Sequence, residues 1–141
     1  MVNAGVARYR DLNGRHLAVL GQAQVDAETI DLQAETTQSR VRVAVAARTR
    51  VLRDGAVVEA DRQLIQQPGF VAQELTIGLE QRRPVTVEKI VALYTSRDRA
   101  ISECRDDARL AATGAADFAG LLARHRGCLA QQLEPLRRPA G

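Results

Sequence analysis

The stretch TVEKIVALYTSRD, residues 86–98, decides how this chain of 141 residues folds. Apolar and β-branched residues up to Tyr94 predict a strand, and the Ser-Arg-Asp corner after it leads into a segment with helical spacing. Both faces of the strand are apolar near its end, which indicates a central position in a sheet. A β region therefore precedes this corner, and a helical region follows it.

A second stretch, QSRVRVAVAARTRV at residues 38–51, alternates with a period of two and predicts a long strand over residues 40–53. Valine, alanine and threonine occupy one face. The other face carries four arginines, which would repel one another without acidic or polar side chains opposite. We expect the preceding strand to supply these partners. The arginines are Arg40, Arg42, Arg48 and Arg50, and the expected partners are Asp31, Gln33 and Glu35.

The remaining elements follow from periodicity and turn residues. Further strands are expected at residues 16–25, 29–36, 56–65, 70–80 and 85–94, with turns at Asn13-Gly14, Asp54-Gly55 and Pro68-Gly69. Helices are expected at residues 99–113 and 117–133, where apolar residues recur with helical spacing. We expect Ser96 or Asp98 to cap the first helix, Gly114 to end it and Pro135 to terminate the second.

The two quoted stretches resemble the N-terminal β-sandwich domain of glycoside hydrolase family 65, which comprises the maltose, trehalose and kojibiose phosphorylases and their hydrolase relatives. The resemblance extends from about residue 2 to His125. It implies a mainly β fold, an antiparallel β-sandwich that is part of a super-sandwich, followed by two C-terminal α-helices. The implied division is a partial sandwich at residues 1–97, two linker helices at 98–134 and a disordered tail at 135–141.

In this family the general-acid glutamate and the phosphate site lie on an (α/α)6 barrel downstream of the sandwich. The resemblance therefore implies a fragment of an enzyme that acts on an α-glucoside disaccharide, with phosphate in the phosphorylases. It assigns this chain no catalytic, cofactor-binding or metal-binding residue and no cofactor. The chain alone would be a non-catalytic structural domain that contributes to a homodimer. The chain departs from the family in two ways. Leu129 and Leu133 stand where relatives commonly carry tryptophan, and the sequence is expected to start midway through the sandwich.

Composition bears on the alternatives. Aromatic residues make up 3% of the chain and there is no tryptophan, which disfavours a stand-alone carbohydrate-binding sandwich because sugar faces stack on aromatic rings. A protein-interaction module stays open. The net charge of +3 comes from arginines spread along the chain, whereas a nucleic-acid interface gathers basic residues on one face. Nucleic-acid binding is therefore disfavoured.

The expected location is the cytoplasm. The N-terminus lacks the apolar run of a signal peptide, and no apolar stretch approaches the length of a membrane span. Cys104 and Cys128 lack the spacing of a metal site, so we expect two buried free thiols, with a disulfide between the helices as the less favoured alternative.

Several polar residues could serve chemistry, and each has a plainer interpretation. Asp98 fits a helix cap better than a catalytic acid, and Asp106 and Asp107 fit a solvated charged helix face. His125 is expected to pack against the sandwich, and His16 stands alone. Glu88 and Lys89 point to opposite faces of their strand and cannot pair with each other. The pair Arg97-Asp98 is the spot most suited to hold a neighbouring domain.

Overall fold

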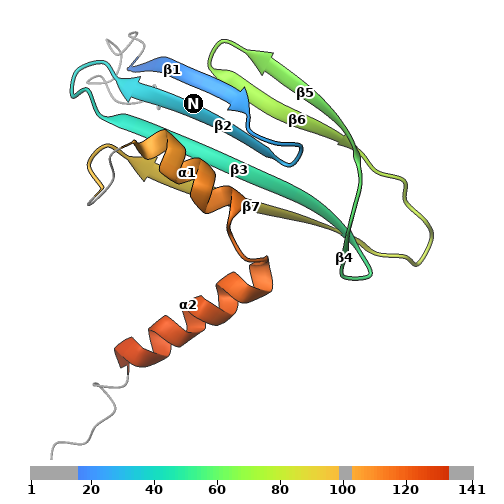
Figure 1. Ribbon diagram of the computed structural model, residues 1–141. Coiled ribbons are helices and arrows are strands. Elements are labelled where there is room, and N and C mark those ends of the chain that lie inside the picture. Colours follow the sequence, from blue (N-terminus) through green and yellow to red (C-terminus); the bar gives the residue numbers. More distant parts are fainter. Residues whose placement is uncertain (1–15, 99–102, 134–141) are drawn as a thin grey trace, which may run out of the picture.

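The computed structural model describes residues 16–98 and 103–133 (Figure 1). Seven antiparallel strands precede two helices, so the predicted mainly β fold with two C-terminal helices is confirmed. The strands are β1 (Leu17–Gln24), β2 (Thr29–Thr36), β3 (Arg42–Arg53), β4 (Ala56–Val58), β5 (Asp61–Gln67), β6 (Phe70–Thr76) and β7 (Val85–Thr95). The helices are α1 (Cys104–Thr113) and α2 (Phe118–Leu133).

Five strands form the main sheet. Strand β3 pairs with β2 along one side, with short β4 beyond the end of β2, and with β7 along its other side. Within the described residues β7 has β3 as its one neighbour, so the prediction of a central position was wrong. Its apolar residues reflect contact with α1 on one face and exposure on the other, rather than burial between two strands.

Strands β5 and β6 form a separate two-stranded sheet that lies against the β1–β2 side of the main sheet (Figure 1). The expected strand at residues 56–65 is therefore divided: Ala56–Val58 stays in the main sheet, and Asp61–Gln67 crosses to the second one. The expected strand at residues 70–80 ends at Thr76, and only an isolated bridge joins Glu80 to Arg83 beyond it. Alternation continues past Thr76 in the sequence, but no partner strand lies beside it in the described residues.

Two predicted turns are present with the backbone geometry that their residues allow. Asp54 and Gly55 both have positive φ, 52° and 82°, as a two-residue hairpin turn of type I′ requires. Pro68 and Gly69 join β5 to β6, with a φ of 78° at Gly69. The expected Asn13-Gly14 turn lies outside the described residues.

Helix α1 packs on one face of the main sheet, which we call the helix face (Figure 1). The buried cluster between α1 and the sheet consists of small residues: Ala44 and Ala46 of β3, and Cys104, Ala108 and Ala112 of α1, flanked by Ala92 and Tyr94 of β7. Small side chains let the helix approach the sheet closely, but they bury little apolar area. The polar groups around this cluster therefore matter for holding α1 in place.

The helix termini differ in part from the prediction. Gly114 ends α1 as expected, and its N–H donates to the carbonyl of Leu110. The N-cap is Glu103 rather than Ser96 or Asp98. Asp98 instead accepts a hydrogen bond from the N–H of Thr95 and closes the turn after β7. Residues 99–102, Pro135 and the expected tail lie outside the described residues.

The opposite side of the main sheet, which we call the open face, is largely apolar. In β3 it carries Val43, Val45 and Val51, and in β7 it carries Val87, Val91 and Leu93. The β5–β6 hairpin covers part of it near Ile30, Leu32, Val45 and Ala47. Val87, Val91 and Leu93 are 55%, 53% and 60% exposed. Contiguous exposed apolar surface is uncommon on soluble monomeric domains.

Candidate functional site

The charged groups around α1 form the most organised polar site among the described residues. At its centre is Asp31 of β2, which is only 2% exposed. Its carboxylate accepts hydrogen bonds from Nε and Nη2 of Arg105 at 2.7 and 3.1 Å, and from Nε of Arg109 at 2.6 Å. Because Arg105 and Arg109 are one helical turn apart, both reach the same carboxylate. Two guanidinium groups thus tie α1 to β2.

The environment of Asp31 favours its charged form. Burial alone raises the pKa of this carboxyl, but the hydrogen bonds and positive charges of Arg105 and Arg109 outweigh burial and hold the pKa below its usual range. The hydrogen bond to Asp31 in turn raises the pKa of Arg105. An ionised carboxylate whose oxygens are occupied in this way stabilises the contact and is poorly suited to act as a general acid.

A second cluster forms at the N-terminus of α1. Glu103 accepts hydrogen bonds from Nε2 of Gln33 and Nη1 of Arg42, both at 2.9 Å, and from the N–H of Arg105 at 3.4 Å. The hydrogen bond from Gln33, followed by the one from the Arg105 backbone, lowers the pKa of the Glu103 carboxyl. One side chain therefore caps the helix and joins it to both β2 and β3.

Arg48 of β3 holds the other end of α1. It is 3% exposed, and its guanidinium donates to the carbonyl of Thr113 at 2.7 Å and to that of Ala115 at 2.8 Å. Carbonyls at the end of a helix have no partner within the helix, and the helix dipole places partial negative charge there. A buried arginine at this position supplies both hydrogen bonds and the opposite charge.

The roles of Arg42 and Arg48 in binding the ends of α1 were not predicted from the sequence. The arginines of the predicted strand at residues 40–53 were expected to pair with residues of β2. In the described residues only Arg40, which lies just before β3, does so, with Glu35 at 2.9 Å. Arg42 and Arg48 bind the two ends of α1, because the helix covers the arginine face of β3. Arg50 pairs with Glu28, which lies just before β2.

Gly21 was also missed. A Cβ added there would lie 2.9 Å from Cζ of Arg105, so the absence of a side chain leaves room for the guanidinium that binds Asp31. Gly21 follows an irregularity in the pairing of β1 with β2. An isolated glycine within a strand pattern signals a bulge or a close approach, and this was the available signal.

The residues singled out from the sequence do not come together. Asp106 is exposed and lies 3.4 Å from Arg109, and Arg97 lies at the exposed turn after β7. His125 is exposed on α2, so the expectation that it packs against the sandwich was wrong. Glu88 lies far along the sheet from Asp98 and accepts a hydrogen bond from the N–H of Phe118 at 2.7 Å, which caps α2. The expectation that this chain holds no catalytic residue stays a prediction.

The cysteines are both free, but only Cys104 is buried, so the expectation of two buried thiols was half right. Cys104 is the first residue of α1 and faces the sheet, and Cys128 is exposed on α2. The described residues contain no group of three histidine, cysteine or carboxylate side chains placed to hold a metal ion. No described helix is both long enough and apolar enough to cross a membrane.

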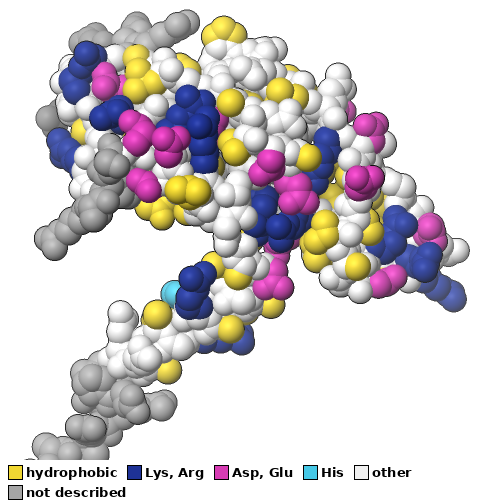
Figure 2. All heavy atoms as spheres, in the orientation of Figure 1, with side chains coloured by type: hydrophobic (Ala, Val, Ile, Leu, Met, Phe, Trp, Pro, Cys, Tyr) yellow, Lys and Arg dark blue, Asp and Glu magenta, His cyan; other side chains and the backbone are white. Residues whose placement is uncertain are grey.

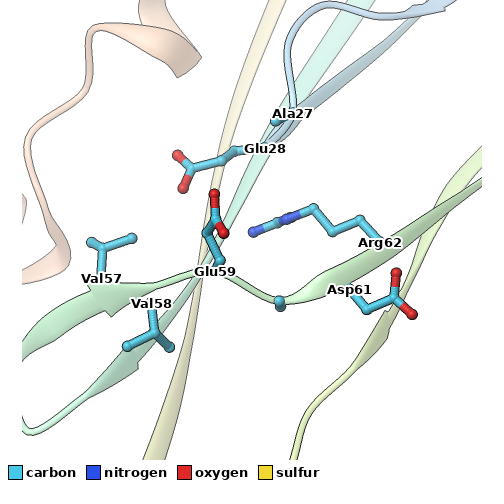
Figure 3. Close-up of a pocket in the computed structure, with 8 residues that line it drawn as sticks. Ala27, Glu28, Val57, Val58, Glu59, Asp61 and Arg62 are labelled. Atoms are coloured by element: carbon cyan, nitrogen blue, oxygen red, sulfur yellow. The ribbon is translucent and has the colours of Figure 1, made fainter.

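A polar hollow of about 660 Å³ lies between the turn before β2 and the β4–β5 connection (Figure 3). Glu28, Glu59, Asp61 and Arg62 line it. Arg62 already donates to the carbonyl of Thr49 at 2.9 Å, and Glu28 pairs with Arg50. The hollow thus offers polar groups but no aromatic platform. Elsewhere on the face drawn in Figure 2, basic side chains are interspersed with acidic ones.

These features define a class of protein: an antiparallel β-sandwich domain followed by helices, with its polar groups used for attaching a helix. Comparison with known proteins agrees with this class. Residues 1–132 match the family described as glycosyl hydrolase family 65, N-terminal domain. The chain belongs to this family, as the resemblance of its strands implied.

Two relatives are similar to this chain, and both are named as uncharacterized glycosyl hydrolases of Mycobacterium tuberculosis, from two strains. Each is 32% identical over 123 residues, which cover 87% of this chain. The chain spans 9% of the length of each relative. It therefore corresponds to a small part of these longer polypeptides.

Proposed function

We propose that this chain is a non-catalytic structural domain of a family 65 enzyme that cleaves an α-glucosidic disaccharide by phosphorolysis or hydrolysis. Family membership over residues 1–132 supports the enzyme class. The chain spans 9% of the length of each relative, which favours an auxiliary role within a longer enzyme. The single observation that carries the structural role is the exposed open face, with Val87, Val91 and Leu93 more than half exposed.

The geometry around α1 fits this role. The buried carboxylate of Asp31 is neutralised by two arginines, and Glu103 and Arg48 bind the ends of the helix. A glycosidase of the usual type needs two carboxyl groups that flank a substrate cleft. Here the organised carboxylates are occupied by arginine or by backbone, which suits a domain that positions other parts of the enzyme.

The finer features belong to the same proposal. Residues 1–97 form the sandwich part, residues 98–134 link it to a catalytic barrel in the longer polypeptide, and the enzyme is a cytoplasmic homodimer to which this domain contributes. The substrate in that enzyme is a disaccharide such as maltose, trehalose or kojibiose, with phosphate as the second substrate of a phosphorylase.

An activity assay tests the proposal. The purified chain is incubated with each of these disaccharides, with and without phosphate, and glucose and glucose 1-phosphate are measured. We expect no release from this chain, and release from a longer family member that includes the barrel. Product release by the 141-residue chain that persists after repeated purification would contradict a non-catalytic role.

A second candidate is a carbohydrate-binding module, favoured by the hollow in Figure 3, where Glu59, Asp61 and Arg62 offer groups that hydrogen-bond hydroxyls. Calorimetric titration with maltose and trehalose separates the two functions. Saturation with a Kd below about 1 mM supports the module. The matched variant is Glu59→Gln, which should weaken binding only if sugar enters the hollow.

A further inference from the structure

The outer edge of β7 has the features of an unpaired sheet edge that can accept a further strand. Val85–Thr95 pairs with β3 along its whole length without a register shift, and no other described strand lies along its outer side. Free sheet edges are usually blunted by proline, a bulge, several charges or a short strand. Strand β7 has eleven residues, no proline and no bulge, and Lys89 is its one basic residue.

A groove runs along this edge. Residues 90–94 of β7 form its floor, Leu110 of α1 lies on one side, and Leu121 and Arg124 of α2 lie on the other. Its volume is about 530 Å³, which is within the range of protein sites that hold a ligand. Figure 1 shows α2 leaving the body beside β7, so the groove lies between a sheet edge and a projecting helix. Leu110 is 70% exposed.

The groove specifies the chemistry of its occupant. On an edge strand, alternate residues turn their N–H and C=O groups outward, and another extended backbone satisfies them at regular spacing. Val91 and Leu93 are exposed on the open face, and Leu110 and Leu121 lie near the helix face. An added strand would therefore be apolar on both of its faces. Arg124 is the one charged residue that lines the groove, and it forms no ion pair with the described residues, which favours a carboxylate on the occupant.

We propose that the outer edge of β7 binds one extended apolar strand that carries a carboxylate opposite Arg124. The strand is contributed by a part of the longer family 65 polypeptide that this chain does not contain, a source that rests on the proposed function. The relatives supply the length of chain required, because this domain spans 9% of each of them. The added strand extends the main sheet and is enclosed between α1 and α2.

A peptide of about six residues, the length of a typical strand, provides the probe. It alternates valine with isoleucine, so that both of its faces are apolar, and has one central glutamate. Calorimetry on the full chain is expected to show saturation with a Kd below about 1 mM. Hydrogen exchange in the same samples is expected to slow by at least about threefold at the outward amides of residues 90–94 and to stay unchanged in β2, whose protection verifies that the domain is folded.

Two controls isolate the mechanism. A peptide with N-methyl groups along one edge keeps its side chains but loses its backbone donors, and it is expected not to bind. The variant Arg124→Glu should weaken binding about threefold to tenfold, and a peptide with lysine in place of glutamate should restore it. Arg126→Glu, a change at an exposed position on the same helix, should have no effect.

Three results would overturn the proposal: no saturation, equal binding of the N-methylated peptide, or concentration-dependent dimerisation that protects residues 90–94 without peptide. The last result would make a second copy the occupant. These results are independent of glucose release, so failure of strand binding and failure of the proposed enzyme role are distinguishable.

Discussion

At the scale of single residues, the buried carboxylate of Asp31 affects the attachment of α1 in two opposite ways: its removal from water costs free energy, and its ion pairs with α1 stabilise the contact. Removing a carboxylate from water is expensive, and only close opposite charges with good geometry offset that cost. Arg105 and Arg109 provide both, at 2.7 and 2.6 Å. The net gain from the intact cluster and the cost of breaking it therefore differ strongly. With Asp31 present every charge has a partner, whereas without its carboxylate the guanidinium groups of Arg105 and Arg109 face each other with no counter-charge between them.

The substitution Asp31→Asn tests this asymmetry. It keeps the size of the side chain but removes the charge, and we expect a loss of about 2–3 kcal/mol in the free energy of unfolding. Urea unfolding followed by circular dichroism measures the change. Asp106→Asn is the control, because Asp106 is exposed and its contact with Arg109 is 3.4 Å long; it should cost less than about 0.5 kcal/mol. Equal effects of the two changes would show that the buried cluster contributes no more than a surface pair.

The same residues predict a pH dependence. The pKa values of Asp31 and Glu103 are lowered in the folded chain. Their contribution is therefore fully present above the unfolded pKa values, about 3.9 and 4.3, and is lost as the pH falls through the folded values. Thermal unfolding between pH 7 and pH 3 should show stability falling below about pH 4. The fall should be shallower in Asp31→Asn, and parallel curves for the two proteins would contradict the assignment to Asp31.

At the scale of elements, α1 is held at its ends and at its middle rather than by a large apolar area. The helix presents alanines and Cys104 to the sheet, and these bury less apolar area than larger side chains would. Glu103 binds at its start, Arg105 and Arg109 in its body, and Arg48 at its end. Position and direction of the helix are thus set by directional hydrogen bonds.

The variant Arg48→Met tests the attachment at the end of α1. Methionine fills much of the buried space but leaves the carbonyls of Thr113 and Ala115 without their donor, so we expect a loss of about 1–3 kcal/mol. Hydrogen exchange should increase in the last turn of α1 more than in β2. Arg48→Lys keeps the charge without the fork-shaped donor group and should recover only part of the stability. Full recovery would assign the effect to charge alone.

Strands were more predictable than their partners. Period-two alternation located β2 with its bounds, and glycine with proline or aspartate located the hairpin turns. The division of residues 56–65 between two sheets could not be predicted, because alternation says nothing about which strand lies alongside. The N-cap was missed for a related reason: Glu103 is held by Gln33 and Arg42, which are more than sixty positions away in sequence. Local patterns carry no information about such contacts.

At the scale of the whole molecule, the two faces of the main sheet are treated differently. The helix face is covered by α1 and its charged attachments, whereas among residues 16–98 and 103–133 the open face is covered only near the β5–β6 hairpin. Burying apolar surface stabilises a protein by roughly 25 cal/mol per Å². Covering the exposed part of the open face with another polypeptide would therefore be favourable. The proposed structural role makes use of this exposed face.

The double substitution Val91→Thr with Leu93→Thr tests whether the chain self-associates through the open face. Threonine suits a strand as well as valine does, so folding should be little affected, while the exposed apolar area decreases. We expect weaker self-association in analytical ultracentrifugation and lower fluorescence of a dye that binds apolar surface. Val57→Thr on β4 is the control, because Val57 is similarly exposed at 53% but lies apart from the open face of β7. If the control lowers association as much as the double substitution, the adhesive surface of the chain lies outside the open face, and the structural role proposed for that face loses its support.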